Sequence, residues 1–268
     1  MTRLETKFQR LERKYLVDEI TADRIRRDIE PWCVPDAHNP ECSGRRRRPD
    51  QLGYEIGTLY LDSPGLAFYN ANMRGDADRL KLRVRTYSRF SPALLEVKRR
   101  FSEVIDKTRV AVDRMRVADA VRGVSAPIDD GPESRRCLEE FGRLSAHAGA
   151  EPTLHLRYER EAYASSVDHY ARVCFDRRIC AQRVDEWALA PQPSGYREFD
   201  QFWRPDVANC CVVLELKCET AVPHWMTSLV RCHGLSRVSF SKYAIGIHVT
   251  GRFDGSRRRA LRDARVMM

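Results

Sequence analysis

The 268-residue sequence predicts an α+β fold in which charged strands close around a water-filled lumen and helices pack on the outside. One observation is RLKLRVR at 79–85, where basic and apolar side chains alternate. Since alternate side chains of a strand point to opposite faces, four cations share one face there. The second observation is a carboxylate two residues from a lysine in three predicted strands. These pairs are Glu12/Lys14, Glu96/Lys98 and Glu215/Lys217.

The number of strands with one charged face favours a closed sheet. A sheet of this kind either leaves its charged face in open water or closes so that the face lines a lumen. Closure also removes the unpaired strand edges that invite association with other chains. We therefore expect a tunnel with a charged interior.

The elements of the first half follow from periodicity and turn residues. A helix is expected to begin with Thr21 as its N-cap and to end before Pro31, which cannot continue it. Ser63 and Pro64 open a second, short helix through Met73. The other elements expected here are strands over 8–17, 54–62, 79–85, 94–100 and 103–113, helices over 117–121 and 133–144, and an irregular loop over 35–50.

The second half carries four further charged strands and one helix. The strands are expected over 152–164, 171–184, 211–219 and 239–249, with the helix over 224–233 before the last strand. No stretch rich in proline, glycine or serine divides the chain. A single domain is therefore expected over 1–268, with its core at about 7–250 and a basic tail at 251–268.

Composition restricts the partners and the compartment. A net charge of +9 favours polyanionic partners. The chain has no apolar run long enough to span a membrane, and its N-terminus lacks the apolar core of a signal peptide. Nine cysteines, an odd number without any CxxC pair, argue against a disulfide framework and a zinc knuckle. These features together predict a protein of the reducing cytoplasm.

A lumen lined by cations requires an anionic guest. Two like unit charges about 4 Å apart repel by about 4 kcal/mol at an effective dielectric constant of 20. Arginine suits phosphate because its planar guanidinium donates two parallel hydrogen bonds, and lysine adds a point charge. Glutamates in such a lumen would place a divalent cation that bridges the oxygens of the guest. The predicted occupant is a triphosphate or a longer phosphate chain.

Seven motifs in order then carry a resemblance to a known family. The sequence resembles the VTC domain, the polyphosphate-polymerase branch of the triphosphate tunnel metalloenzyme (CYTH-like) superfamily. The motifs are ERKYLV at 12–17, RLKLRVR at 79–85, LLEVK at 94–98, YEREAY at 158–163, RVCFDRRI at 172–179, VLELK at 213–217 and SKY at 241–243.

The resemblance implies an eight-stranded antiparallel tunnel that transfers the γ-phosphoryl group of ATP onto a polyphosphate chain with Mn²⁺ or Mg²⁺. Glu215 matches the metal-holding acidic residue of the family, and strand parity adds Glu12 as a second candidate ligand. Lys14 is expected near the transferred group. The positions that match phosphate-gripping residues of the family are Lys14, Arg83, Arg85, Lys98, Lys107, Arg160, Arg172 and Lys242.

Several alternatives stay open at the level of sequence. The same tunnel would serve a triphosphatase or nucleotide phosphohydrolase, or a polyphosphate-binding module without activity. An alternative role for Lys107 is that of an ordinary edge-strand charge that discourages aggregation. An alternative role for Glu96 is that of a charge partner that orients Lys98. The role of Asp176 is open.

The sequence limits the partners other than phosphate only in part. No P-loop motif is present. The arginine run 45–48 and the basic tail suggest nucleic-acid binding as a further alternative, although no specific nucleic-acid partner is expected. A membrane partner is compatible with the sequence, and the oligomeric state is not determined by it.

Overall fold

The computed structural model describes residues 10–39, 51–87, 91–101, 104–168, 170–200, 212–219 and 221–251. The arginine run 45–48, the predicted strand residues 8 and 9, and the tail after residue 251 lie outside these ranges. Within them, no helix is long and apolar enough to cross a membrane.

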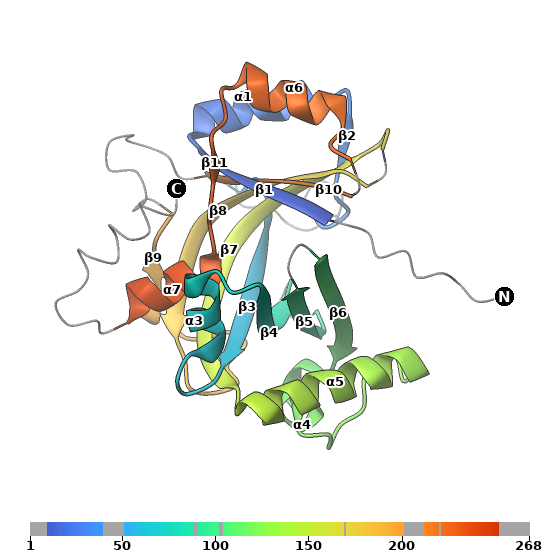
Figure 1. Cartoon of the computed structure of the whole chain (residues 1–268), viewed down its shortest axis with the longest axis vertical. Coiled ribbons are helices and arrows are strands. Elements are labelled where there is room, and N and C mark those ends of the chain that lie inside the picture. The colour runs from blue at the N-terminus through green and yellow to red at the C-terminus, as the bar shows by residue number, and fades with distance from the viewer. Residues whose placement is uncertain are drawn as a thin grey trace.

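One antiparallel sheet of eleven strands organises the chain (Figure 1). Its main path runs in the order β11-β1-β10-β8-β7-β3-β4-β5-β6, while β2 pairs with β7 and β9 pairs with β8. The strands are β1 (Arg10–Val17), β2 (Cys33–Pro35), β3 (Tyr54–Asp62), β4 (Asp78–Thr86), β5 (Ala93–Phe101), β6 (Val104–Val112), β7 (Glu151–Ser165), β8 (Arg172–Arg183), β9 (Arg197–Glu198), β10 (Val212–Glu219) and β11 (Arg237–Val238).

Six helices accompany the sheet in the described ranges, which confirms the α+β class. They are α1 (Glu19–Ile29), α3 (Ala67–Arg74), α4 (Val117–Val121), α5 (Pro132–Ala148), α6 (His224–Cys232) and α7 (Lys242–Thr250).

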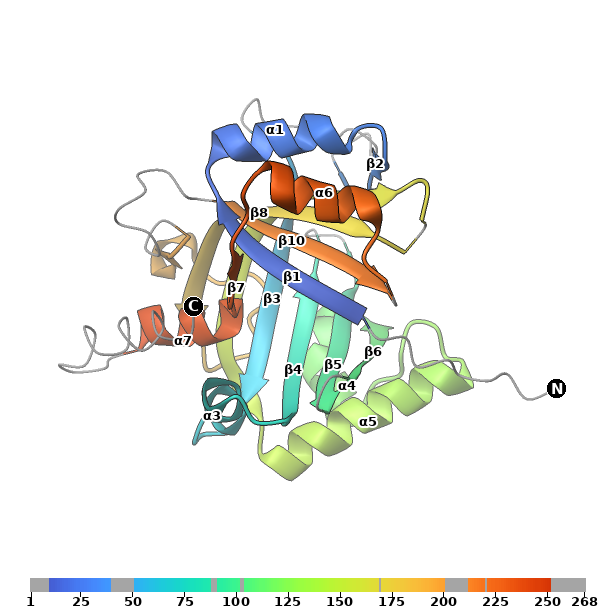
Figure 2. The ribbon, with the colours of Figure 1, turned by 45° about the horizontal axis from the view of Figure 1, so that its top comes forward.

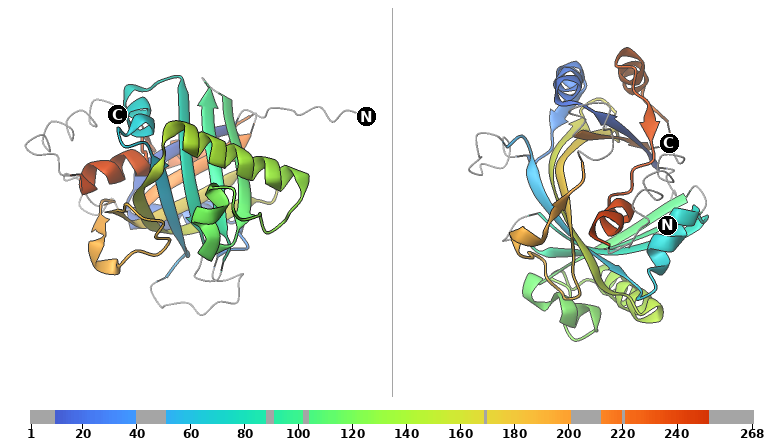
Figure 3. Two further views of the ribbon diagram at one scale, coloured as in Figure 1. Left: turned by 90° about the horizontal axis from the view of Figure 1, so that it is seen from below. Right: turned by 90° about the vertical axis from the view of Figure 1, so that its left-hand side faces the viewer.

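Helices on the convex face of the curved sheet cover its apolar side chains. Helices α1 and α6 lie side by side over β1, β10 and β8 (Figure 2), where Tyr15, Phe175 and Leu214 are buried. Helices α4 and α5 cover β3 to β6 (Figure 3, left), where Leu82 and Phe141 are buried. The alternation of apolar and charged residues leaves the opposite, concave face to the charged side chains.

Helix α7 departs from the prediction that all helices lie outside. It packs inside the curve of the sheet (Figure 3, right), against β7 and β8. Gly246 makes this approach close, because a Cβ there would lie 2.6 Å from Cδ2 of Leu154. The hydroxyl of Tyr243 donates to Asp62, whose carboxylate also accepts from the backbone N–H groups of Phe68 and Tyr69 in α3. Helix α7 is thereby held near its N-terminus by Tyr243 and at its middle by the close packing at Gly246.

The prediction of a closed, eight-stranded tunnel is wrong. The sheet has eleven strands, and in the described ranges no backbone ladder joins the edge strand β6 to β1 or β11. Two residues of β11 occupy the free edge of β1, opposite Lys14 and Tyr15. The chain then turns into the concave side as α7, which packs against β7 and β8 in the middle of the strand order. The remaining gap is spanned by side chains, with Lys98 of β5 lying 3.5 Å from Glu12 of β1.

Two local predictions also need correction. Most of the strand predicted over 239–249 is instead the helix α7, which begins at Lys242 after Ser241, the N-cap that accepts from the backbone N–H of Ala244. This helix is apolar on nearly every side, so its sequence has no helical period. At α1 the N-cap is Asp18, whose carboxylate accepts from the backbone N–H of Thr21, and not Thr21 itself.

Candidate functional site

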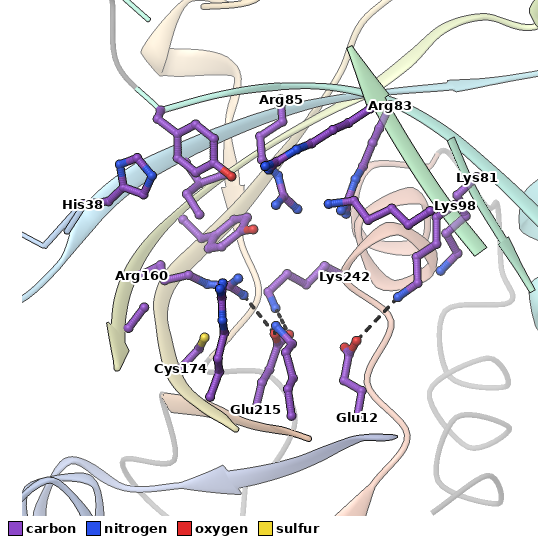
Figure 4. A pocket seen from close by; sticks show the side chains of 18 of the residues that line it. Glu12, His38, Lys81, Arg83, Arg85, Lys98, Arg160, Cys174, Glu215 and Lys242 are labelled. Atoms are coloured by element: carbon purple, nitrogen blue, oxygen red, sulfur yellow. Dashed lines mark hydrogen bonds and ion pairs between the residues drawn. The ribbon is translucent and has the colours of Figure 1, made fainter. Parts of the chain in front are cut away.

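The concave face encloses a cavity of about 1850 Å³ in whose lining basic side chains outnumber acidic ones (Figure 4). It is lined by side chains from β1, β3, β4, β5, β6, β7, β8, β10 and α7. All ten residues predicted from the sequence as site residues line it. They are Glu12, Lys14, Arg83, Arg85, Lys98, Lys107, Arg160, Arg172, Glu215 and Lys242.

Two buried carboxylates form the centre of one wall. Glu215, which is 4% exposed, lies 2.6 Å from the amine of Lys217 and 2.8 Å from that of Lys242. The oxygen that pairs with Lys217 also accepts a hydrogen bond from Arg160 at 2.9 Å. Asp176 is wholly buried, accepts two hydrogen bonds from Arg160, and pairs with Lys242 at 2.5 Å. This wall is therefore a lattice of alternating charges.

The lattice fixes the protonation states of its members. Burial by itself disfavours the charged form of Glu215, but Lys217, Lys242 and Arg160 outweigh burial and hold the pKa of Glu215 well below its usual range. Burial likewise opposes ionisation of Asp176, whose pKa is nevertheless lowered, first by Arg160. Burial would lower the pKa of Lys242, yet the two carboxylates raise that pKa. All of these groups are charged at neutral pH.

Glu96 is the centre of the opposite wall. This wholly buried carboxylate accepts from Nε of Arg83 at 2.7 Å, and its other oxygen lies 2.7 Å from the amine of Lys107. It does not orient Lys98, which pairs with Glu12 instead. Residues two apart on one strand face are farther apart than directly opposed residues of neighbouring strands, and Arg83 stands directly opposite Glu96 in the register.

Lys14 connects the two carboxylates predicted to hold a metal. Its amine lies 3.4 Å from Glu12 and 3.8 Å from Glu215, and it donates to the backbone oxygen of Phe240 at 2.7 Å. Burial would raise the pKa of Glu12, but Lys14 and its neighbouring cations hold that pKa below the usual range. Glu12 and Glu215 are thus ionised carboxylates on adjacent strands, on either side of one amine.

Lys81 is a cavity residue that the sequence analysis did not select. In the described part of the chain its only hydrogen-bond partner is the hydroxyl of Ser241, at 3.5 Å. Burial, followed by repulsion from Lys14 and Lys98, lowers the pKa of Lys81 to about 7. Its position in the alternating stretch 79–85 was the available signal, since it shares a face with Arg83 and Arg85.

Other residues that were not predicted from the sequence contact the predicted site residues. Tyr158 lines the cavity, and Arg160 and Lys242 lie over its ring at 5.4 and 5.1 Å, distances typical of cation–π contacts. The hydroxyl of Tyr60 accepts from Arg83 at 3.3 Å. Asp176 shares a strand face with Arg172, which is a signal that could have identified it.

The predicted cations differ in their surroundings. Arg172 is exposed at the rim of the cavity, whereas Arg85 and Arg160 are buried. Lys107 lies on the edge strand β6 and also faces the cavity, so both sequence interpretations of this residue describe its position. Burial lowers its pKa to about 8, with Glu96 acting in the opposite direction.

The residues fit a divalent cation that is shared with a phosphate guest. In the described ranges no three His, Cys, Asp or Glu side chains are grouped to hold a metal by themselves. Mg²⁺ is commonly bound by one or two carboxylates together with substrate phosphates. Glu12 and Glu215 supply that number of carboxylates in a cavity whose remaining lining suits phosphate.

Two solved structures align with most of this chain. HpAC1 from Hippeastrum, named for adenylyl cyclase and described as having a dominant triphosphatase activity, aligns with a TM-score of 0.47 and 14% identity. That alignment covers 90% of this chain and 96% of HpAC1. The PH1819 protein from Pyrococcus horikoshii OT3 aligns with a TM-score of 0.44 and 10% identity over 88% of this chain and 97% of its own.

The sequence matches one family model and no curated protein. The family model of the VTC domain matches residues 9–250, which include every predicted site residue. The chain therefore belongs to the VTC domain family.

Proposed function

We propose that the protein is a metal-dependent polyphosphate polymerase that transfers the γ-phosphoryl group of ATP onto the end of a polyphosphate chain. The observation that carries this proposal is the convergence of cations from seven strands and α7 on one cavity. Such a cavity repels itself without a guest of high negative charge density. A chain of phosphates supplies that charge, and membership of the VTC domain family supports the same proposal.

The cavity residues would act by positioning and by charge stabilisation, which provide most of the catalysis in phosphoryl transfer. Arg83, Arg85 and Arg160 would hold phosphate oxygens in a fixed geometry, since buried carboxylates already orient Arg83 and Arg160. Lys14 would neutralise charge at the transferred group. A divalent cation held by Glu215 and Glu12 would supply further charge neutralisation.

The acceptor chemistry favours transfer to phosphate over transfer to water. A terminal phosphate is largely ionised at neutral pH and needs no base to become a nucleophile. Water needs one, and the carboxylates of the cavity are poor bases because neighbouring cations lower the pKa of Glu12, Glu96 and Glu215.

Hydrolysis is the second candidate, and Lys81 is the observation that favours it. With its pKa lowered to about 7, a fraction of its amine is neutral at neutral pH and can accept a proton from water. Hydrolysis would then release inorganic phosphate without forming longer chains, and Lys81→Met would abolish that release.

Incubation of the protein with ATP and Mn²⁺ or Mg²⁺ tests the proposal. The expected products are ADP and a ladder of phosphate chains on a gel. Glu215→Gln should abolish both, whereas Asp130→Asn, which alters an ion pair on the outer surface, should not. Phosphate release without a ladder would establish the hydrolase, and tripolyphosphate binding that survives chelation without ADP formation would establish a binding module.

A further inference from the structure

Three aromatic rings from separate segments meet at one side of the phosphate cavity. The rings of His38 and Tyr87 are nearly parallel, with an interplanar angle of 8° and centroids 5.1 Å apart. The ring of Tyr54 is tilted against both, with centroids at 5.6 Å from His38 and 6.0 Å from Tyr87. All three line the same cavity as the cations. We call these three residues the aromatic cluster.

The aromatic cluster adjoins two of the phosphate-facing arginines. Tyr87 is two residues beyond Arg85, the last of the alternating cations of β4. Tyr54 stands directly opposite Arg160 in the pairing of β3 with β7. Figure 4 shows His38 on the Arg85 side of the cavity, across from Lys81 and Lys98. The cavity therefore has aromatic rings on the Arg85 side and charged side chains, among them Lys81, Lys98 and Glu12, on the other.

The loop that carries His38 is held in place. Asn39 is buried, its amide donates to the backbone oxygen of Ala162 at 2.8 Å, and its side-chain oxygen accepts from the backbone N–H of Ala162 at 3.1 Å. The carboxylate of Asp36 accepts from the backbone N–H of His38 at 3.0 Å. His38 is nevertheless exposed, so its ring is presented to solvent from a fixed loop and does not serve to fill the core.

We propose that the aromatic cluster is the subsite for the nucleobase of the nucleoside triphosphate, an inference that rests on the proposed function. Aromatic side chains bind bases by stacking, which is tolerant of base identity because every base has a π-face. The adjacent Arg85 and Arg160 then receive the phosphates, whose γ end points toward Lys98 and Glu12. The donor enters with its base on the aromatic side, and the growing chain extends on the other side.

Calorimetric binding of ATP, GTP and inorganic tripolyphosphate to the whole chain tests this assignment. In Tyr87→Ala the dissociation constant of ATP should rise about tenfold, which corresponds to the loss of one stacking contact. The tripolyphosphate constant should stay within about twofold, because it has no base. GTP should respond as ATP does, and Tyr87→Phe, which keeps the ring, should bind both as the unaltered protein does.

A second variant keeps the test decisive if Tyr87→Ala does not fold. His38→Ala removes an exposed ring and should reproduce the selective loss of nucleotide affinity, with an unchanged thermal midpoint. Equal losses for ATP and tripolyphosphate, or no loss for either, in His38→Ala would overturn the assignment. If the unaltered protein binds tripolyphosphate, and both ring-removing variants bind ATP as tightly as the unaltered protein does, the subsite assignment alone fails. If it binds neither, the proposed function fails first.

Discussion

Asp176 accepts two hydrogen bonds from Arg160, at 2.6 and 2.7 Å, although its carboxylate is wholly buried. Arg160 then reaches Glu215 at 2.9 Å, so a single guanidinium joins two buried acids. A guanidinium held at so many points loses little freedom when a phosphate arrives. Preorganisation of the cations by buried carboxylates is thus the main structural feature of the cavity.

Removing the carboxylate charge of Asp176 should destabilise the fold. In Asp176→Asn, Arg160 and Lys242 remain buried with one acid fewer, and breaking a buried pair costs about 3–5 kcal/mol. Urea unfolding should show this loss, whereas Asp130→Asn, at an ion pair on the outer surface, should unfold as the unaltered protein does. Equal stability of the two variants would contradict the role given to Asp176.

Glu96→Gln should make the thermal stability of the protein depend more strongly on bound tripolyphosphate. The substitution leaves Arg83 and Lys107 without the acid that neutralises them. Because tripolyphosphate supplies the missing negative charge to the native state only, it should raise the thermal midpoint more in this variant than in the unaltered protein. A smaller or equal rise, measured by scanning calorimetry at one ligand concentration, would argue that the guest does not contact this wall.

Tripolyphosphate binding should take up protons above pH 7. The pKa of Lys81 lies below the usual lysine value of 10.5, at about 7, so its amine is mostly neutral at pH 8. A bound phosphate favours the charged form and raises this pKa, so affinity falls as pH rises through and above 7. Calorimetry at pH 8 in buffers of different ionisation enthalpy measures the uptake.

Lys81→Met should reduce this proton uptake without abolishing it. Lys107, with its pKa lowered to about 8, titrates in the same range and remains in the variant. Uptake by Lys81 on binding would also argue against its use as a base for hydrolysis, because the protonated amine cannot accept a proton. Unchanged uptake in the variant would show that the guest does not reach Lys81.

Gly246→Val should move α7 and weaken phosphate binding. A Cβ at Gly246 would already lie 2.6 Å from Leu154 and 3.1 Å from Leu156, and valine adds two methyl groups. Overpacking of this kind costs about 1–3 kcal/mol, and the shift carries Lys242 away from Glu215. The matched control is Gly65→Val, where no atom lies within 4 Å of the added Cβ. Equal tripolyphosphate affinity in both variants would contradict a rigid placement of α7.

The sequence by itself determined which side chains of a strand share a face. Strand parity is a local property of the backbone, so the alternation in 79–85 and the spacing of Glu215 and Lys217 assigned side chains to faces before any pairing was known. The strand β3 was also predicted at its observed bounds, Tyr54–Asp62. The charged interior follows from this signal, whereas the helices of the α+β class were predicted from capping residues and helical spacing.

Only the tertiary structure decided which charges meet and how the sheet ends. Glu96 binds Arg83 and Lys107, and not Lys98 two residues away, because contacts form across strands whose register no local pattern records. Residues 242–250 form a helix on the concave side of the sheet, where they pack against β7 and β8, although the segment has no helical period to signal it. Over the described residues the sheet ends at β6 and β11, and side chains such as Lys98 and Glu12 make the contact between its two sides, which the alternation along one strand cannot specify.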